Sequence, residues 1–530
     1  MRSLLFPAVA LLFACSLSAQ PVVNQGGVLN AASFTRDGLP GEGIAQGGMF
    51  AVFGQGMGPA GLVQAGSIPL PTELAGTSIA VTVGGQSVHA FILFTFSGQL
   101  AAVLPSKTPV GVGTLTVTFN GQTSAPVSIN VVQNAFGIFT RNQAGFGPAI
   151  VQNFISQAEA PLNSLVQAAH PGQVAILWGV GLGPITGDDA DFPPVGSLPF
   201  NVEVILGGHS IVSPLYAGRS PQFPGIDQIN FTVPEGLQGC YVSVAVRVNG
   251  VLSNFGMMAV SSNGRYCGDP FTPEQLMMAE QAGRLRVGAA AMTIGPGITP
   301  EVESEAGDYS LALLNSSTLT FIGFETHITP TGTCTVWPVM DDFFPVDPVE
   351  PIELLGGDLS FTTPAGTLTE DDEIPENFFP PGLLTIRSTA GPNVGAFEIS
   401  TTIPPIGTLN SPVEPARIDR TQDLPIRWSG VGGAGRMVLI LGRSDDQSRG
   451  VGRTFVCSAD AVAGQFTVPS TILQGLPRSV AAGALEDGPG FLIVGSTPRP
   501  DAGRVTSVPG IDAGFLVPIQ VFGVATPNYE

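Results

Sequence analysis

Four short sequence patterns recur in the same order in the first half of the chain, and this duplication limits the fold more than any other feature. The segment GGMFAVFGQGMGP at 47–59 corresponds to PGQVAILWGVGLGP at 171–184, so that Gly54 matches Gly179 at an offset of 125 residues. Three further pairs follow in order: GGQSV (84–88) with GGHSI (207–211), QLAAVLP (99–105) with QINFTVP (228–234), and VTFNG (117–121) with VRVNG (246–250). Matches that keep their order at nearly constant spacing indicate a duplicated structural unit with small changes in loop length.

Each copy has the pattern of a series of short β-strands. β-branched residues alternate with other residues in five runs, at 78–83, 114–119, 127–132, 202–206 and 241–248. Asn120-Gly121 and Asn249-Gly250 follow two of these runs, and Asn-Gly is the preferred pair of a two-residue hairpin loop. We therefore predict an all-β fold that begins with tandem immunoglobulin-like antiparallel β-sandwiches, at residues 20–137 and 138–268.

The motifs of this region resemble those of a known family. GGVLNAASF (26–34), the G-x-G-x-G-P turn, DQINFTVP (227–234) and GCYVSVAVRVNGVLSNF (239–255) resemble the uncharacterised C-terminal repeat family of secreted acidobacterial proteins. Each half also resembles an IPT/TIG immunoglobulin-like domain, although Gln99-Leu100-Ala101 replaces the usual Gln-Ile-Asn in the first copy. The resemblance covers about residues 24–268. It implies a β-sandwich fold and an extracellular location, and it carries no catalytic residues.

The N-terminus is typical of a secretory signal peptide. Arg2 precedes an apolar run that ends at Ala14, and small residues then lead to a cleavage site after Ala19. The alternative is a lipoprotein box in which Cys15 is acylated, but the large side chain of Phe13 disfavours it. No later segment has 18 consecutive apolar residues, so no transmembrane helix is expected in the mature chain. We predict a protein that is secreted or held at the outer cell surface.

Four cysteines follow the predicted cleavage site, and an even number in an exported chain favours disulfides over metal ligation. The absence of a C-x-x-C pattern also argues against a zinc knuckle or a redox motif. Cys240 with Cys267 is the favoured pair, and Cys334 with Cys457 is the default second pair. The sequence alone allows three pairings.

The second half is predicted to contain one short helix followed by β domains. A capping box begins at Thr272 and Gly283 would end the helix, which places a helical spacer at 269–290. Strand-like runs follow at 309–314, 318–324, 383–388, 396–401, 426–430, 437–442 and 515–522. Pro-rich breaks divide this part into an acidic β domain at 291–405 and a C-terminal β-sandwich at 406–530.

The charge of the chain excludes some functions. The 41 Asp and Glu against 20 Lys and Arg give a net charge of −21, so nucleic-acid binding, which needs cations that neutralise phosphates, is not expected. Acidic residues also cluster in two short segments: Glu370, Asp371, Asp372 and Glu373, and the loop residues Asp188, Asp189 and Asp191. We interpret both as solvated loops, with weak structural calcium binding as the alternative, because neither has EF-hand spacing. No other cofactor is expected.

No catalytic motif is complete in the sequence. Residues 56–61 satisfy G-x-G-x-x-G, but Pro59 and the surrounding β repeat favour turn glycines over a dinucleotide-binding loop. No G-x-S-x-G or H-E-x-x-H occurs, and the histidines are scattered along the chain, at His89, His170, His209 and His327. His209 is predicted to lie exposed in a hairpin turn.

Few aromatic side chains are available to stack on a sugar. Trp178 is predicted in the core, whereas Trp337 and Trp428 are candidate exposed platforms for a ligand. We predict a non-catalytic binding, adhesion or structural role, with a glycan, an envelope component or a surface protein as partner. The alternative is an extracellular hydrolase of glycosidase or esterase type with accessory immunoglobulin-like domains.

Overall fold

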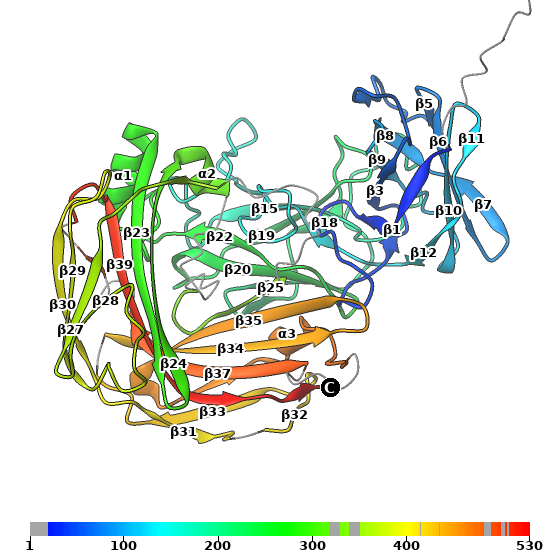
Figure 1. The fold of residues 1–530 in the computed structure, drawn as a ribbon. Coiled ribbons are helices and arrows are strands. Elements are labelled where there is room, and N and C mark those ends of the chain that lie inside the picture. The colour runs from blue at the N-terminus through cyan, green and yellow to red at the C-terminus, as the bar shows by residue number, and fades with distance from the viewer. Residues whose placement is uncertain are drawn as a thin grey trace, which may run out of the picture.

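The computed structural model describes residues 20–316, 329–338, 350–413, 415–433, 435–481, 489–499, 504–505 and 508–530. The fold is all-β, as predicted, with many antiparallel sheets and a few short helices (Figure 1). The signal peptide predicted at 1–19, the strand predicted at 318–324 and His327 lie outside the described residues. Among the described residues, no helix is both long and apolar enough to cross a membrane.

The first sandwich has two sheets that share one core. One sheet contains, in spatial order, β1 (Val22–Asn30), β3 (Met49–Gln55), β9 (Gln99–Val103), β8 (Phe91–Thr95) and β4 (Val63–Gln64). The other contains β2 (Ile44–Ala45), β12 (Val127–Val132), β10 (Gly111–Phe119), β6 (Thr77–Val83) and β5 (Glu73–Leu74), with β11 (Gln122–Thr123) beside β10 and β7 (Gln86–His89) beside β6. Phe50 and Val52 of the first sheet pack with Val81 and Leu115 of the second, and this burial stabilises the pair of sheets.

The second sandwich repeats this arrangement. Its first sheet contains β13 (Gly137–Ile138), β15 (Val174–Val180), β19 (Asp227–Thr232) and β18 (Tyr216–Arg219), with β14 (Val151–Asn153) beside β15. Its second sheet contains β17 (His209–Ile211), β16 (Val202–Leu206), β20 (Gly239–Val248) and β21 (Val251–Leu252), with β22 (Gly256–Val260) beside β20. β15 lies between β13 and β19 as β3 lies between β1 and β9, which confirms the tandem sandwiches.

The duplication extends to single turns and hydrogen bonds. Asn120 and Gly121 have φ of 48° and 81°, and their counterparts Asn249 and Gly250 have 48° and 88°. Positive φ at both loop positions is the type I′ geometry predicted from the Asn-Gly pairs. After each hairpin a serine hydroxyl accepts a hydrogen bond from a strand N–H, at 3.0 Å for Ser124 and 2.9 Å for its counterpart Ser253. The two copies therefore share the same hairpin geometry and the same serine hydrogen bond.

Helix α1 (Pro273–Ala282) forms where the capping signals predicted it. The Thr272 hydroxyl accepts from the Gln275 N–H at 3.2 Å, and the Gln275 side chain accepts from the Thr272 N–H at 2.9 Å. Gly283 ends the helix in the left-handed region, with φ of 72°. Leu276, which is fully buried, packs α1 against the nine-stranded sheet of the second half.

We expect T272A to destabilise the fold by about 1 kcal/mol, because the substitution removes the side chain that caps α1. A urea titration followed by intrinsic fluorescence measures this loss. An unchanged midpoint would contradict a stabilising role for the capping box.

A nine-stranded sheet forms the centre of the second half. Its spatial order is β25 (Cys334–Pro338), β35 (Val451–Asp460), β34 (Arg436–Asp446), β37 (Gly490–Pro498), β39 (Ala513–Ala525), β23 (Arg284–Gly295), β24 (Ile298–Ser310) and β26 (Ile352–Glu353), with β38 (Arg504–Val505) beside β39. β23 and β39 pair in parallel, and the other neighbours along this order are antiparallel. The sheet crosses the boundary predicted between 291–405 and 406–530, and β23 begins within the predicted spacer, 269–290. Because one sheet contains strands from all three predicted segments, its strands do not show where one domain ends and the next begins. The domain limits therefore remain predictions.

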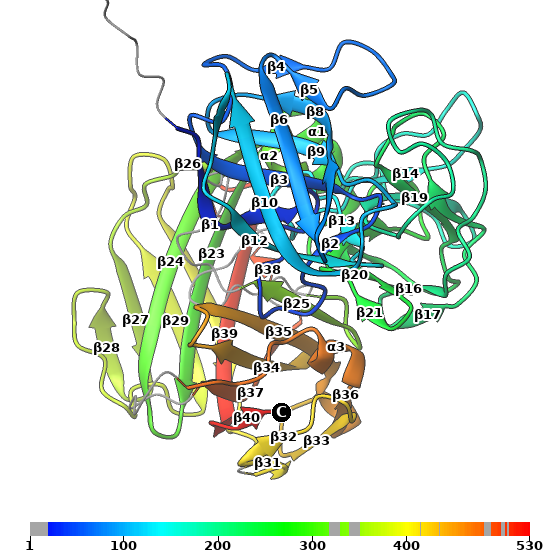
Figure 2. The same cartoon turned by 90° about the vertical axis from the view of Figure 1, so that its right-hand side faces the viewer.

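Both faces of this sheet are covered. In β34, Met437 and Leu439 contribute to a core with α1 and the second sandwich, whereas Val438 and Ile440 face the opposite core. Two smaller sheets cover that opposite side (Figure 2). They contain β28 (Gly366–Thr369), β27 (Leu359–Thr363), β29 (Gly382–Ser388) and β30 (Phe397–Ile403) in one, and β31 (Thr408–Ser411), β33 (Leu424–Ser429) and β36 (Gln465–Val468) in the other. β32 (Arg417–Ile418) pairs with β40 (Asn528–Tyr529) near the C-terminus.

The prediction of a single helix was incomplete. Helix α2 (Leu311–Ser316) occupies most of the run 309–314 that was predicted as a strand, and α3 (Ser470–Gln474) and a short 3-10 helix, η1 (Ala461–Ala463), also form. Leu and Ala have high helix propensity, and a short apolar run fits either a buried strand or a buried helical turn. Leu313 and Leu314 are buried in α2, so the run still places its apolar side chains in the core.

Candidate binding site

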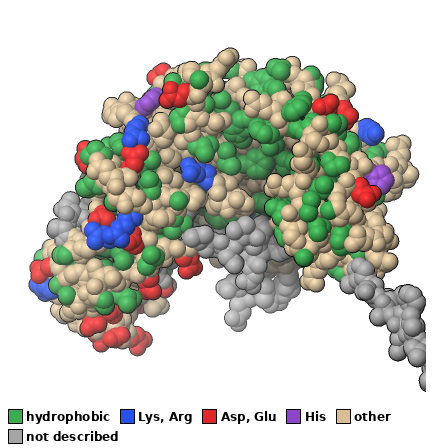
Figure 3. Space-filling view, turned by 90° about the horizontal axis from the view of Figure 1, so that it is seen from above, with side chains coloured by type: hydrophobic (Ala, Val, Ile, Leu, Met, Phe, Trp, Pro, Cys, Tyr) green, Lys and Arg blue, Asp and Glu red, His purple; other side chains and the backbone are tan. Residues whose placement is uncertain are grey.

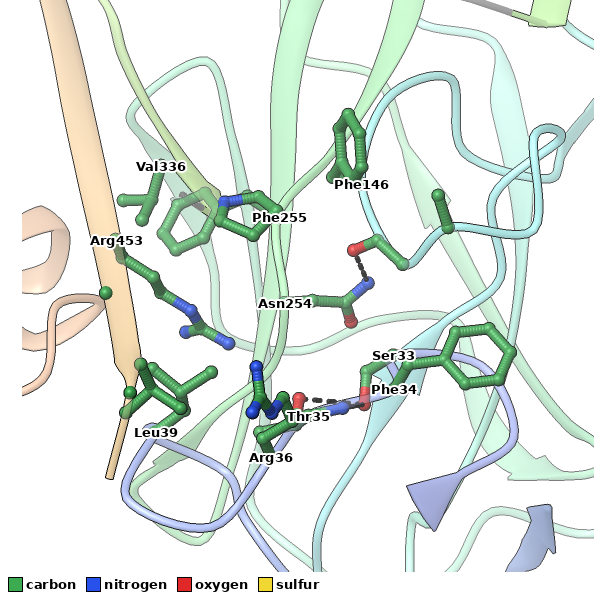
Figure 4. A pocket seen from close by; sticks show the side chains of 16 residues that line it. Ser33, Phe34, Thr35, Arg36, Leu39, Phe146, Asn254, Phe255, Val336 and Arg453 are labelled. Atoms are coloured by element: carbon green, nitrogen blue, oxygen red, sulfur yellow. Dashed lines mark hydrogen bonds between the residues drawn. The ribbon is translucent and has the colours of Figure 1, made fainter. Parts of the chain in front are cut away.

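A small pocket lies where three parts of the chain meet (Figure 4). Its volume is about 70 Å³. The first sandwich contributes residues 33–36 and Leu39, the second contributes 144–146 and 254–255, and the nine-stranded sheet contributes Val336, Pro338 and 450–453. We call this site the junction pocket.

The loop from the first sandwich is fixed by hydrogen bonds at its base. The Asn30 side-chain oxygen accepts from the N–H groups of Ala32 and Ser33, at 2.9 and 3.1 Å. Its amide nitrogen donates to the Ala135 carbonyl at 2.9 Å, which ties the loop to the segment that leads into the second sandwich. Because Asn30 is buried, these bonds hold the loop in one conformation over the pocket.

Asn254 positions the wall from the second sandwich. Its amide nitrogen donates to the carbonyls of Ile138 and Gly145, at 3.0 and 2.8 Å, and its oxygen accepts from the Ile138 N–H at 2.7 Å. The neighbouring Phe255 is buried and lines the pocket. The pocket wall is therefore formed by side chains with few alternative positions.

These two residues mark a difference between the copies. Ser253 matches Ser124 at an offset of 129 residues, so Asn254 and Phe255 stand where the first copy has Ala125 and Pro126. The sequence comparison missed this signal, because only the shared positions of the repeat were considered. A sequence difference directly after a retained serine is a local signal that the second copy makes contacts there that the first copy lacks. Here these contacts form a wall of the junction pocket.

The third wall comes from two paired strands. In β25, Val336 pairs with Phe455 of β35, and Pro338 pairs with Arg453. The predicted disulfide Cys334–Cys457 joins the same strands directly across the ladder, and Cys240–Cys267 is also present. The favoured cysteine pairing is thus confirmed, and one bridge lies beside the pocket wall.

Arg453 is the most unusual residue of this pocket. Its side chain is 5% exposed, and it donates to the Gly475 carbonyl at 3.0 Å. Within the part of the chain that the structure describes, it forms no ion pair. Burial lowers the pKa of Arg453 to about 10, so the guanidinium stays charged at neutral pH. A buried charge without an opposite charge is costly, and such groups are usually paired.

A second arginine lies at the same pocket. Figure 4 shows the side chains of Arg36 and Arg453 pointing toward one another. None of the described lining residues is Asp or Glu, although the whole chain has twice as many acids as bases. Figure 3 shows that charged side chains on the face seen from above lie mainly toward its two ends. The described lining of the junction pocket thus contains two arginines and no carboxylate.

The acidic loop of the second sandwich has a structural role. The Asp189 carboxylate accepts from the N–H and hydroxyl of Ser106, at 2.6 and 2.7 Å, and so links the two sandwiches. Burial raises the pKa of Asp189. Asp188 accepts from the Ala190 N–H at 3.0 Å and Asp191 from the Phe192 N–H at 2.7 Å. Each of the three carboxylates therefore accepts hydrogen bonds from its own donors.

The second acidic cluster, 370–373, lies in an exposed turn after β28. Asp372 accepts from the Thr369 N–H and hydroxyl, both at 2.8 Å, and these hydrogen bonds lower the pKa of Asp372. No group of three or more His, Cys, Asp or Glu that could hold a metal ion occurs among the described residues, which include both acidic segments. The geometry gives no support to the calcium alternative, and we do not propose it.

The prediction of Trp337 and Trp428 as exposed platforms was wrong. They are 3% and 4% exposed, because both lie on strands whose faces form the cores of the second half. The Trp428 ring N–H donates to the Ala461 carbonyl at 2.8 Å. Trp178 is half-buried, and its ring N–H donates to Gln152 at 2.9 Å. His209 is exposed at the start of β17, as predicted.

Comparison with protein-family models and with curated proteins gave no match. Among solved structures, the chain is similar to S-layer protein SbsC domains 5–6 (14% identity, 46% of this chain and 100% of that chain, TM-score 0.17). It is also similar to the plexin A4 extracellular region (13%, 46% and 18%, TM-score 0.17) and to the Bacteroides ovatus protein SGBP-B in complex with a mixed-linkage heptasaccharide (10%, 51% and 64%, TM-score 0.21). The chain thus spans less than a fifth of the plexin region. At these TM-scores the fold assignment rests on this chain's own sheets.

Proposed function

We propose that the protein is a non-catalytic binding protein of the cell surface or extracellular space, and that it binds a glycan at the junction pocket. The observation that carries the proposal is the convergence of three parts of the chain, distant in sequence, on one recess whose walls are fixed by buried hydrogen bonds. Binding sites of this kind are largely pre-formed, with a few polar groups among apolar side chains. Two disulfides suit an oxidising compartment.

The test is retention without turnover. The purified protein is incubated with a panel of neutral and acidic polysaccharides and assayed by pull-down and affinity electrophoresis, in parallel with chromogenic esters and glycosides. We expect retention on at least one polysaccharide and no release of chromophore. Turnover that is lost on mutating a single acid or serine would contradict the proposal and favour the hydrolase alternative.

A further inference from the structure

We infer that the second half of the chain binds a single aliphatic chain in an apolar cavity between two of its sheets. The cavity has a volume of about 220 Å³ and lies between the nine-stranded sheet and the sheet that contains β27, β29 and β30 (Figure 1). We call it the intersheet cavity. It shares no described lining residue with the junction pocket, so the inference does not depend on the proposed function.

One wall of the intersheet cavity follows from a change in side-chain size along β23. Successive residues of a strand alternate between its two faces. On the face toward β27 and β29, Met292 is buried in the core, and Ala290 and Gly288 follow toward the start of the strand. Gly288 pairs with Gly514 of β39 and with Ala306 of β24. Three adjacent strands thus have very small side chains at this level, and the space between the two sheets is not filled there.

The opposite wall is apolar and only partly covered. Ile386 of β29 and Phe397 and Ile399 of β30 line the cavity. Ile386 is buried, whereas Phe397 and Ile399 are half-buried although they pack against the core between the two sheets. Leu355, which also lines the cavity, is 51% exposed. An apolar ligand that covers these side chains removes their surface from water, which is favourable.

The size of the cavity indicates the length of the ligand. An engineered apolar cavity of about 150 Å³ binds benzene, which has six carbon atoms. At the same ratio of volume to carbon atoms, about 220 Å³ holds roughly eight or nine carbons. Because two packed sheets are only about 10 Å apart, a thin and flexible aliphatic chain fits between them better than a bulky ring system.

The rim of the cavity limits the head group that such a chain can carry. Glu305 and Glu353 line the cavity, and both are exposed. β24, β26 and β27 all lie within residues 287–386, which contain no Lys or Arg. A carboxylate head would therefore be repelled at this rim, whereas an uncharged or cationic head would not. The occupant is thus the chain of an amphiphile whose head group is not anionic.

Titration calorimetry on the full chain with 1-alkanols from butanol to decanol tests the inference. Each methylene group that enters an apolar site should strengthen binding by about fourfold. We expect the affinity to rise by about this factor per carbon and to level off at about eight or nine carbons, where the cavity is full. Equal affinities for butanol and octanol, or no binding of any alkanol, would overturn the inference.

Octanoate and octyltrimethylammonium test the head group, because they carry opposite charges on chains of equal length. We expect octanoate to bind at least about threefold more weakly than octyltrimethylammonium at low ionic strength. E353Q should narrow this ratio, because it removes one carboxylate from the rim. Tighter binding of octanoate than of octyltrimethylammonium would contradict the assignment of the head group.

Three variants assign the binding to the cavity. A290L adds a side chain on β23, so it should weaken octanol binding about tenfold or more and stop the rise in affinity at a shorter chain. I399A removes most of a half-buried side chain on β30 and should move the end of the rise to a longer chain. A365L is the control, because Ala365 is exposed in the turn between β27 and β28, and it should leave every affinity unchanged.

The variants keep the inference falsifiable and separate it from the proposed function. I399A shifts the chain length in the direction opposite to A290L, so it remains decisive if A290L fails to fold. A rise that ends at the same chain length in wild type and I399A would place the alkanol elsewhere and overturn the inference. Retention on polysaccharides tests the proposed function at the junction pocket, and its result does not depend on whether alkanols bind.

Discussion

We expect the C334A/C457A variant to lose about 5 kcal/mol of stability, the largest effect of any change considered. The bridge joins cysteines that are 123 residues apart, and in the chain-entropy model a cross-link stabilises more when it closes a longer loop. Both cysteines are buried in the core beneath β25 and β35, so the substitution also removes packed sulfur atoms. Urea titration of oxidised and variant protein measures the loss.

The C240A/C267A variant is the matched control. Its bridge spans 27 residues and should be worth about 3.5 kcal/mol in the same model. The two variants also differ in the expected effect on ligand binding, because only β25 carries Val336 and Pro338 of the junction pocket. We expect C334A/C457A, and not C240A/C267A, to weaken retention on a polysaccharide that the wild-type protein binds. Equal stability of wild type and C334A/C457A would contradict a bridge in the native protein.

The first half of the fold could be predicted because its signals are local. The runs at 127–132 and 202–206 match β12 and β16 residue for residue, and the Asn-Gly pairs form the expected hairpins. β-branched alternation and two-residue turns act over a few neighbours, so a single copy of the sequence contains them. The repeat in turn predicts that the two sandwiches contain corresponding strands in the same order along the chain.

The centre of the second half could not be predicted in this way. β23 contains RLRVGAAAMTIG, and Gly and Ala are depleted in strands, so its pattern resembles a continuation of the spacer. What makes it a strand is its place between β24 and β39, and β39 lies more than 200 residues later in the chain. Pairing over such a distance leaves no periodic signal in the sequence of either partner alone.

The candidate site was missed for the same reason. Residues 33–39, Asn254, Phe255 and Arg453 belong to three different sheets or their loops, and no short motif joins them. The two tryptophans chosen as platforms instead follow the ordinary preference of large apolar rings for the core. The one local clue was the pair Asn254-Phe255 in place of Ala125-Pro126, which becomes informative only once the repeats are superposed.

The same superposition isolates a buried ion pair in the second sandwich. Arg219 and Asp227 are 2% and 0% exposed and form a salt bridge, whereas the first copy has Gly98 at the position of Asp227. Arg219 also donates to the Gly183 carbonyl at 2.9 Å, and Asp227 accepts from the Leu182 N–H at 2.7 Å. The pair thus anchors the glycine turn of the second copy. Burial raises the pKa of Asp227 to about 6, although Arg219 opposes this shift.

We expect R219M to lose about 3–5 kcal/mol at pH 8, because it leaves the Asp227 carboxylate buried without its counter-ion. R387M removes one partner of an exposed pair and should lose less than about 1 kcal/mol. The double variant R219M/D227L should recover most of the loss, since an apolar pair of similar volume needs no counter-charge. A loss in R219M no larger than that in R387M would show that the buried pair does not stabilise the turn.

The pH dependence of R219M gives a second, independent readout of the same pair. Without Arg219, the pKa of Asp227 in the folded state should rise further above its unfolded value of about 3.9. The folded state then binds more protons than the unfolded state between these two values, so the stability of R219M falls as the pH rises through this window. We therefore expect R219M to be closer to wild type at pH 5 than at pH 8 in urea titrations. In R219M/D227L this difference between the two pH values should become smaller, because the Asp227 carboxyl is gone and of this pair of neighbouring carboxyls only Asp189, whose pKa Arg219 also lowers, still titrates. A difference as large as that in R219M would assign the pH dependence to a group other than Asp227.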